Sequence, residues 1–194
     1  MTWYAMPQTR EQMVSRIAAA GTHFQPGSAF RYCNAGYILL TYILEEVYAK
    51  PFAEILEEKI TRPAGLAHTR ISSEIDPRQG DALSYNLIGE WVPAAETQAS
   101  VALGAGALSS TASDLVKFAD ALDEGFFGHG IMEKMKQMKQ MKDGYGRGLM
   151  DISNGDSKGY GHTGGIDGFV SLMAVFVDTV VFCSNGMDFH AQRH

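Results

Sequence analysis

The 194-residue chain has few cysteines, no excess of basic charge and no long uninterrupted apolar run. Its two cysteines, Cys33 and Cys183, are too few for a disulfide framework or a zinc-ribbon site, and we expect no metal and no cofactor. Lys and Arg number 16 against 22 Asp and Glu, so the net charge is −6. This balance excludes a general nucleic-acid binder, because little would drive counterion release from phosphates.

Membrane and export signals are also missing from the sequence. The longest apolar stretch, residues 169–183, is interrupted by polar residues and is shorter than the ~20 residues that a spanning helix needs. The first seven residues have neither the basic region nor the apolar core of a signal peptide. We therefore expect no membrane span, and the compartment stays open.

What the sequence does contain is typical of a globular protein, with 45% hydrophobic and 20% charged residues. Apolar residues at helical spacing predict helices over about 8–20, 34–48 and 51–62. Thr111 and Asp114 predict a capping box at the start of a further helix, in which the Asp114 side chain bonds back to the Thr111 N–H. Weak strand signals lie around 83–91, and strands are expected at 158–163, 168–177 and 180–184.

Helices followed by antiparallel strands indicate an α+β fold, since repeated β-α-β units would alternate the two. We expect one structural domain with two parts. Residues 1–143 would form a mainly helical lobe, and residues 144–194 would form the antiparallel strands.

The first candidate site is Tyr32-Cys33-Asn34, which follows a Pro-Gly turn and begins a helix. A tyrosine there can present its phenol as a proton shuttle, and the Asn34 amide can bind a polar substrate group. The alternative is structural, because Tyr and Asn are common at helix starts and Asn is a favoured cap.

The second candidate is Gly161-His162-Thr163-Gly164-Gly165, on an expected strand. Glycines let a substrate backbone approach the strand, and the Gly165 N–H could serve as an oxyanion donor. His162 and Thr163 could bind an anionic or polar group. The alternative is a tight turn or bulge with an incidental histidine.

Taken together, these features resemble the penicillin-recognising serine hydrolases, which include class C β-lactamases, D-alanyl-D-alanine carboxypeptidases and related esterases. The likeness is carried, in order, by residues 24–37, 60–69, 104–115, 145–148, 161–165 and 183–185. The resemblance implies a β-lactamase/transpeptidase-like fold. It also implies roles for six residues: Tyr32 as proton shuttle, the Gly165 N–H as half of the oxyanion hole, and Asn34, His162, Thr163 and Gly164 as substrate ligands.

One motif of that family is missing here. None of the serines has a lysine three positions on, whereas the family's nucleophile lies in Ser-x-x-Lys upstream of Tyr-x-Asn. The nearest candidates are Ser28 and Ser113. Ser28 has Arg31 at that position, and arginine cannot act as a base, whereas Lys117 lies one position too far from Ser113. We therefore expect a piece of such an enzyme, truncated at both ends and inactive by itself.

Two functions remain open at this point. The first is acyl-transfer hydrolysis of an ester or amide, with the peptidase and esterase branches favoured because His162 stands where other members carry lysine. The second is a catalytically inactive ligand-binding module or interaction fragment. Expected partners are a small-molecule or peptide substrate, and either a second copy or a complementing N-terminal segment. Association would occur through residues 158–184, where three strands would leave apolar surface bare.

Overall fold

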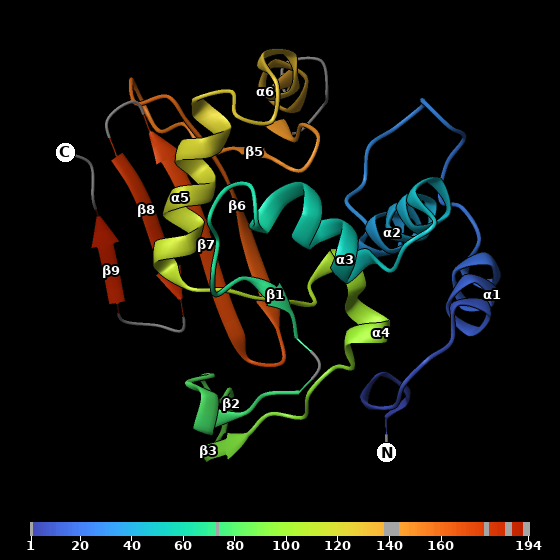
Figure 1. The fold of residues 1–194 in the computed structure, drawn as a ribbon. Coiled ribbons are helices and arrows are strands. Elements are labelled where there is room, and N and C mark those ends of the chain that lie inside the picture. The colour runs from blue at the N-terminus through green and yellow to red at the C-terminus, as the bar shows by residue number, and fades with distance from the viewer. Residues whose placement is uncertain (1, 73, 138–143, 177–178, 185–187, 192–194) are drawn as a thin grey trace.

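The chain is described by a computed structural model over residues 2–72, 74–137, 144–176, 179–184 and 188–191. Helices α1 to α4 gather on one side of a five-stranded antiparallel sheet, and α5 lies across the face of that sheet (Figure 1). The helices are α1 Arg10–Ala20, α2 Asn34–Tyr48, α3 Phe52–Leu56, α4 Ala99–Ala102, α5 Ala112–Asp123 and α6 His129–Met135. The arrangement is the expected α+β fold. The boundary expected at residue 143 lies outside the described residues.

Local sequence signals set the ends of the first helices. Thr9 and Gln12 form a complete capping box, so α1 begins at Arg10. Helix α2 has the predicted bounds, and Cys33 is its N-cap. The predicted third helix divides into α3 and a π-helical turn over Glu57–Thr61.

The capping box expected at α5 is only half correct. The Thr111 hydroxyl accepts the Asp114 N–H at 3.2 Å, as predicted. The Asp114 carboxylate instead accepts the His68 N–H at 2.7 Å and the Thr69 hydroxyl at 3.0 Å. Its side chain is fully buried, and these bonds join the start of α5 to the distant loop that contains His68 and Thr69.

The large sheet has the order β5-β6-β7-β8-β9, so it contains the three strands expected in residues 158–184 and one further strand on either side of them. Its strands are β5 Met150–Asp151, β6 Gly159–Ile166, β7 Phe169–Phe176, β8 Thr179–Ser184 and β9 Asp188–Ala191. The two missed strands, β5 and β9, are too short to show a periodic apolar pattern. Two small antiparallel pairs, β1 Arg70–Ile71 with β4 Leu108–Ser109 and β2 Tyr85–Ile88 with β3 Glu90–Pro93, lie outside it.

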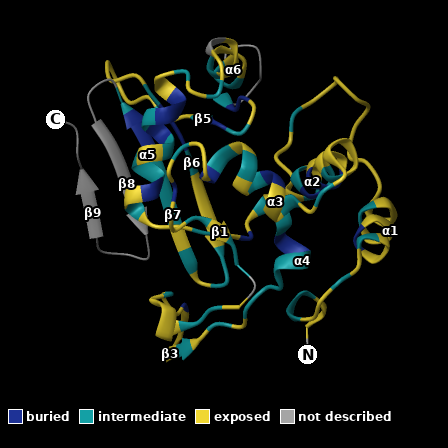
Figure 2. Ribbon diagram, in the orientation of Figure 1, coloured by how far each residue is buried: buried dark blue, intermediate teal, exposed yellow. Residues whose placement is uncertain are grey.

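Two apolar cores hold these layers together (Figure 2). Between α5 and the sheet, Ala119 packs with Leu149, Tyr160 and Val175. Between the helices, buried residues of α1, α2 and α4 form the second core: Met13, Ile38, Tyr42 and Val101. Strand β7 was expected to be apolar on both faces, with one face partly bare. Its opposite face is mixed, because Ala174 is buried whereas Val170 is 62% exposed.

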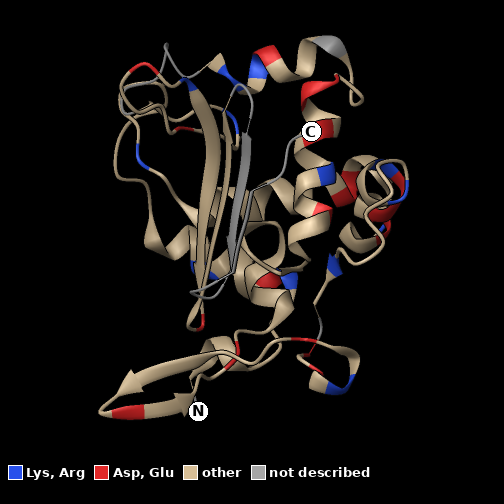
Figure 3. Ribbon diagram, turned by 90° about the vertical axis from the view of Figure 1, so that its left-hand side faces the viewer, with Lys and Arg blue, Asp and Glu red and all other residues tan. Residues whose placement is uncertain are grey.

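Charged side chains are spread over the helices and loops, while strands β6 and β7 contain no Lys, Arg, Asp or Glu (Figure 3). The β2–β3 hairpin projects from the body of the molecule in the same view. Within the described ranges, no helix has the length and apolar character needed to cross a membrane.

Candidate active site

Four side chains from distant parts of the sequence meet where the helices approach strand β6. They are Tyr32 from the loop before α2, Tyr37 from α2, Tyr145 from the stretch before β5, and His162 from β6. The Tyr32 ring centroid lies 6.0 Å from that of His162, 5.5 Å from that of Tyr145 and 5.8 Å from that of Tyr37. The structure therefore brings together Tyr32 and His162, as the sequence predicts. We call these four residues the tyrosine–histidine cluster.

Hydrogen bonds connect three members of the cluster in a row. The Tyr37 and Tyr145 hydroxyls are 2.7 Å apart, and the Tyr145 hydroxyl lies 2.9 Å from His162 Nε2. His162 Nδ1 lies 2.5 Å from the Thr163 carbonyl oxygen. Phe30 stacks on the Tyr145 ring, with centroids 5.6 Å apart. The row ends at the backbone of β6.

The turn after β6 is held from outside the sheet. Asp167, which has φ of 51°, accepts the Thr97 N–H at 2.5 Å and the Thr97 hydroxyl at 2.7 Å. Gly168 has φ of 85°, and a Cβ there would lie 2.8 Å from the Tyr85 carbonyl oxygen of the β2–β3 hairpin. Only glycine fits this close backbone approach. These contacts fix the end of β6 that carries Gly165.

One edge of β6 is open beside the cluster. The Gly159 carbonyl accepts from Ile152, and the Gly159 N–H donates to the Ser153 hydroxyl, so the backbone groups of Gly159 point toward β5. Residues two apart in a strand present their backbone groups to the same edge. The N–H and C=O groups of Thr163 and Gly165 therefore point toward the same edge as those of Gly159. Strand β5 pairs only as far as Gly161, and no strand within the described residues pairs with this edge beyond it.

The predicted site residues differ in their surroundings. The Tyr32 side chain is 43% exposed, and its hydroxyl makes no hydrogen bond within the described part of the chain. Asn34 is exposed in the first turn of α2, and among the described residues its side chain makes no hydrogen bond to the cluster. Thr163 pairs with Leu172 on the face of the sheet opposite His162. Gly164 lies on the His162 face, where a Cβ would collide with Ser171 Oγ.

Two phenols of the cluster are held in their neutral form. Burial is the main factor that raises the pKa of Tyr145 far above its ordinary value, and the hydrogen bond with Tyr37 adds to it. Burial also raises the pKa of Tyr32, with Tyr37 and Cys33 contributing. Both hydroxyls therefore carry their protons at neutral pH and can donate them.

Sequence reasoning missed Tyr37 and Tyr145 as members of the site. Tyr145 lies in a glycine-rich stretch that contributes to the family resemblance, yet neither composition nor spacing assigns it a partner. The flanking Gly144 and Gly146 are a signal for a tight turn that presents a side chain, and they could have drawn attention to it.

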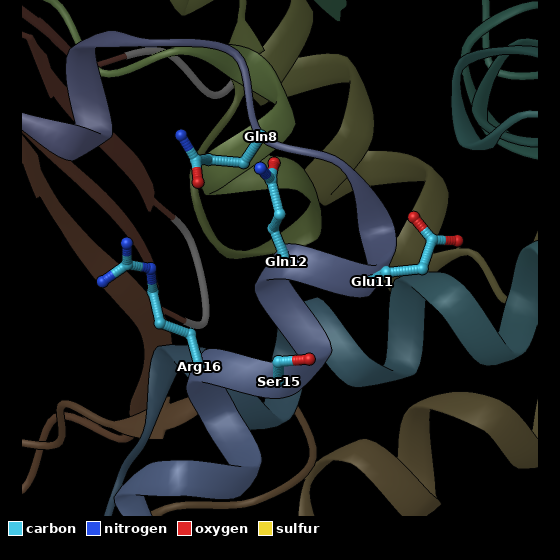
Figure 4. A pocket seen from close by; sticks show the side chains of 5 residues that line it. All are labelled: Gln8, Glu11, Gln12, Ser15 and Arg16. Carbon is cyan, nitrogen blue, oxygen red and sulfur yellow. The ribbon is translucent and has the colours of Figure 1, made fainter.

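The pocket on α1 and the metal-ligating side chains give no second candidate site within the described residues. A shallow pocket on α1 is lined by polar side chains that belong to none of the cluster's elements, with Glu11, Gln12 and Arg16 among them (Figure 4). The described residues contain no group of three or more His, Cys, Asp or Glu placed to hold a metal ion.

Curated proteins similar to this chain include a penicillin-binding protein and a D-aminopeptidase. The chain is 27% identical over 186 residues to penicillin-binding protein 4* of Bacillus subtilis, and 26% identical over 179 residues to a D-aminopeptidase of Brucella anthropi. Each alignment covers 84% of this chain but only 41% and 32% of the respective relative.

Solved structures of related proteins have the same fold as this chain. A D-stereospecific amidohydrolase from Streptomyces sp. superposes with a TM-score of 0.80 at 26% identity, over 89% of this chain and 54% of its own. An octameric penicillin-binding protein homologue from Pyrococcus abyssi has a TM-score of 0.72 at 24% identity, over 91% of this chain and 42% of its own, and supports the fold alone. The chain thus spans about half or less of the length of these relatives.

The Beta-lactamase family model matches residues 1–190, which is nearly the whole chain. The order of motifs, the α+β fold and the relatives agree with that match. The chain belongs to the beta-lactamase family.

Proposed function

We propose that the chain supplies part of the active site of a hydrolase that cleaves an amide or ester by acyl transfer, on the peptidase and esterase side of the family. The observation that carries this proposal is the 6.0 Å approach of the Tyr32 and His162 rings beside the open edge of β6. Two motifs far apart in sequence converge on a strand edge that an extended substrate can join.

In this proposal the open edge binds the reacting carbonyl. The Gly165 N–H points to that edge and donates to the oxyanion that develops when a serine attacks. Thr163 and Gly164 form the strand along which the substrate lies. Asn34 binds the substrate amide from the helical side, and its exposed side chain is available for this role.

Tyr32 transfers the proton. Its raised pKa keeps the phenol protonated, so the hydroxyl is suited to protonate the leaving amine or alcohol as the acyl bond breaks, while the proton released by the attacking serine replaces the one that Tyr32 gives up. To accept a proton first, as a phenolate, it would need a nearby cation that lowers the pKa. Its hydroxyl has no hydrogen-bond partner in the described part of the chain, and its side chain is 43% exposed, so it is accessible to a substrate.

The nucleophile is proposed to come from outside these 194 residues, because none of their serines lies in Ser-x-x-Lys. The same observation favours a second candidate function, a ligand-binding module that retains the strand edge and has lost the chemistry. In both cases we propose amides of D-amino acids as the ligand class. The names of a D-aminopeptidase and of a D-amino acid amidase from Ochrobactrum anthropi, which is 27% identical, support this class.

Binding and chemistry can be tested separately. We expect D-phenylalanine amide to shift the NMR signal of the Gly165 N–H in the 194-residue chain. Tyr32→Phe should weaken the binding, whereas Tyr48→Phe, which alters a tyrosine of similar exposure at the far end of α2, should not. Unchanged spectra at a saturating amide concentration would contradict the proposed site.

Covalent labelling then distinguishes the two functions. A fluorophosphonate probe should label no serine of the 194-residue chain, and labelling of any of them would refute the external nucleophile. The coding sequence upstream of residue 1 is the next measurement. A Ser-x-x-Lys motif there, with labelling of its serine in the longer chain, would establish the enzyme, and its absence would favour the binding module.

A further inference from the structure

The hydrogen bonds around His162 define which of its nitrogens carries the proton. The Thr163 carbonyl oxygen, 2.5 Å from Nδ1, can only accept a hydrogen bond, so Nδ1 must be the donor. A neutral imidazole carries one proton, and Nε2 is then an acceptor. The Tyr145 hydroxyl, 2.9 Å away, therefore donates to Nε2.

The direction of the remaining bond follows. Because the single Tyr145 hydroxyl proton is used toward His162, the Tyr145 oxygen accepts the proton of the Tyr37 hydroxyl at 2.7 Å. The Thr163 carbonyl as acceptor at Nδ1 and the Tyr145 hydroxyl as donor at Nε2 thus both favour the Nδ1–H form of His162. Tyr145 is only 8% exposed, its ring stacks on Phe30 and contacts the tilted ring of Tyr32, and this packing holds its hydroxyl in place.

This arrangement has a consequence for the substrate. In the neutral imidazole both nitrogens are engaged within the protein, and neither offers an N–H to a ligand. Strand β6 contains no Lys or Arg, and the cluster itself is three tyrosines and a histidine. A substrate carboxylate beside this strand therefore finds no donor on His162, and burying an unpaired charge there is costly.

We propose that Tyr145 is a positioning residue that holds neutral His162 in its Nδ1–H form, and that it thereby directs the site toward amide and ester substrates without a carboxylate next to the cleaved bond. This inference rests on the proposed function for its substrate, but the hydrogen-bond arrangement can be measured without activity. Tyr145 touches neither the reacting carbonyl nor the nucleophile in this assignment. It acts through His162.

Nitrogen-15 NMR of the imidazole tests the positioning role directly. At a pH where His162 is neutral, the wild-type chain should show a protonated Nδ1 and an unprotonated Nε2. Tyr145→Phe removes the donor to Nε2 and should raise the population of the Nε2–H form. Tyr37→Phe is the matched control, because it also removes one buried hydroxyl of the row but leaves the Tyr145 donor in place, so the tautomer should not change.

A wild-type His162 in the Nε2–H form would overturn the proposal, as would a tautomer that Tyr145→Phe leaves unchanged. If the phenylalanine variant does not fold, the wild-type spectrum still decides which nitrogen is protonated. A thermal melt of each variant accompanies the spectra.

The preference for uncharged substrates is tested with a matched ligand pair, N-acetyl-D-alanyl-D-alanine and its C-terminal amide. The wild-type chain should bind the amide at least as tightly as the acid, and Tyr145→Phe should strengthen binding of the acid about tenfold by releasing an imidazole N–H. Tighter binding of the acid by the wild-type chain, unaffected by Tyr145→Phe, would refute the preference. If neither peptide binds, the proposed function fails, while the tautomer still reports on Tyr145.

Discussion

Replacing Asp114 with asparagine should destabilise the fold without touching the proposed active site. The Asp114 side chain has no exposed surface, and its carboxylate accepts hydrogen bonds from the His68 N–H, the Thr69 hydroxyl and the Lys117 ammonium. These bonds fasten the first turn of α5 to the loop that precedes β1. Asparagine has nearly the same size, so the substitution changes charge and hydrogen bonding but leaves no cavity.

The size of the effect follows from the bonds that are weakened. Hydrogen bonds to a charged group contribute about 1.5–3 kcal/mol in proteins, more than bonds between neutral groups. The Lys117 side chain is 50% exposed, so its ion pair with Asp114 adds little. An asparagine oxygen can still accept from His68 and Thr69 but without the charge, and we expect a loss of about 2 kcal/mol in the free energy of unfolding. For a chain of this length the midpoint temperature should fall by about 4–8 °C.

The loss should also depend on pH. Burial by itself would raise the pKa of Asp114, but the hydrogen bonds from His68, Thr69 and Lys117 outweigh it and hold the pKa below its ordinary value. A carboxylate with a depressed pKa in the folded state stabilises the fold above the unfolded-state value of about 3.9, and that contribution is lost as the pH falls through the folded-state value. The wild-type and Asp114→Asn chains should therefore differ fully above about pH 5, and the difference should begin to shrink below about pH 4 as the pH falls toward the depressed folded-state value.

Urea unfolding followed by circular dichroism from pH 3 to 7 measures both quantities. Asp120→Asn is the control, because it removes the same charge from the same helix, where the described residues give Asp120 no side-chain hydrogen bond. This control should change stability by less than about 0.5 kcal/mol. Equal effects of the two substitutions, or a difference that persists unchanged to pH 3, would refute the assignment of Asp114 as a buried, bonded carboxylate.

Two further predictions concern the sheet. Gly168→Ala should cost about 2 kcal/mol, because φ is 85° and the added Cβ would meet the Tyr85 carbonyl, whereas Gly155→Ala, with φ of 58° and open space around it, should cost less in a denaturant titration. We also expect the chain to form a dimer or larger species through the 158–184 region, and Val170→Lys, at a position 62% exposed on β7, should lower the mass measured by light scattering. A wild-type chain that is a stable monomer at micromolar concentration would contradict this expectation. If Val47→Lys lowers the mass and Val170→Lys does not, the interface lies on the exposed apolar stripe of α2 and not on the sheet.

Much of the local structure could be read from the sequence. Helix α2 has the predicted bounds, because its apolar residues recur at helical spacing and each turn depends on neighbours within four positions. Strands β6, β7 and β8 fall close to the predicted ranges for a similar reason. The motif residues Tyr32 and His162 were also found from the sequence, through their order along the chain and the family it resembles.

The partners of those residues were decided by tertiary structure. Tyr145 joins Tyr37 to His162 although it is distant from both in sequence, and the carboxylate of Asp114 bonds to His68 and Thr69 instead of completing its own helix cap. Such contacts depend on which distant segments pack together, and no local pattern encodes them. The edge of β6 beyond Gly161 is of the same kind, since among the described residues β5 stops pairing there and no other strand continues. The sequence alone determined most of the helices and strands and singled out the motif residues. Packing between distant segments determined which hydrogen bonds orient the side chains of those residues.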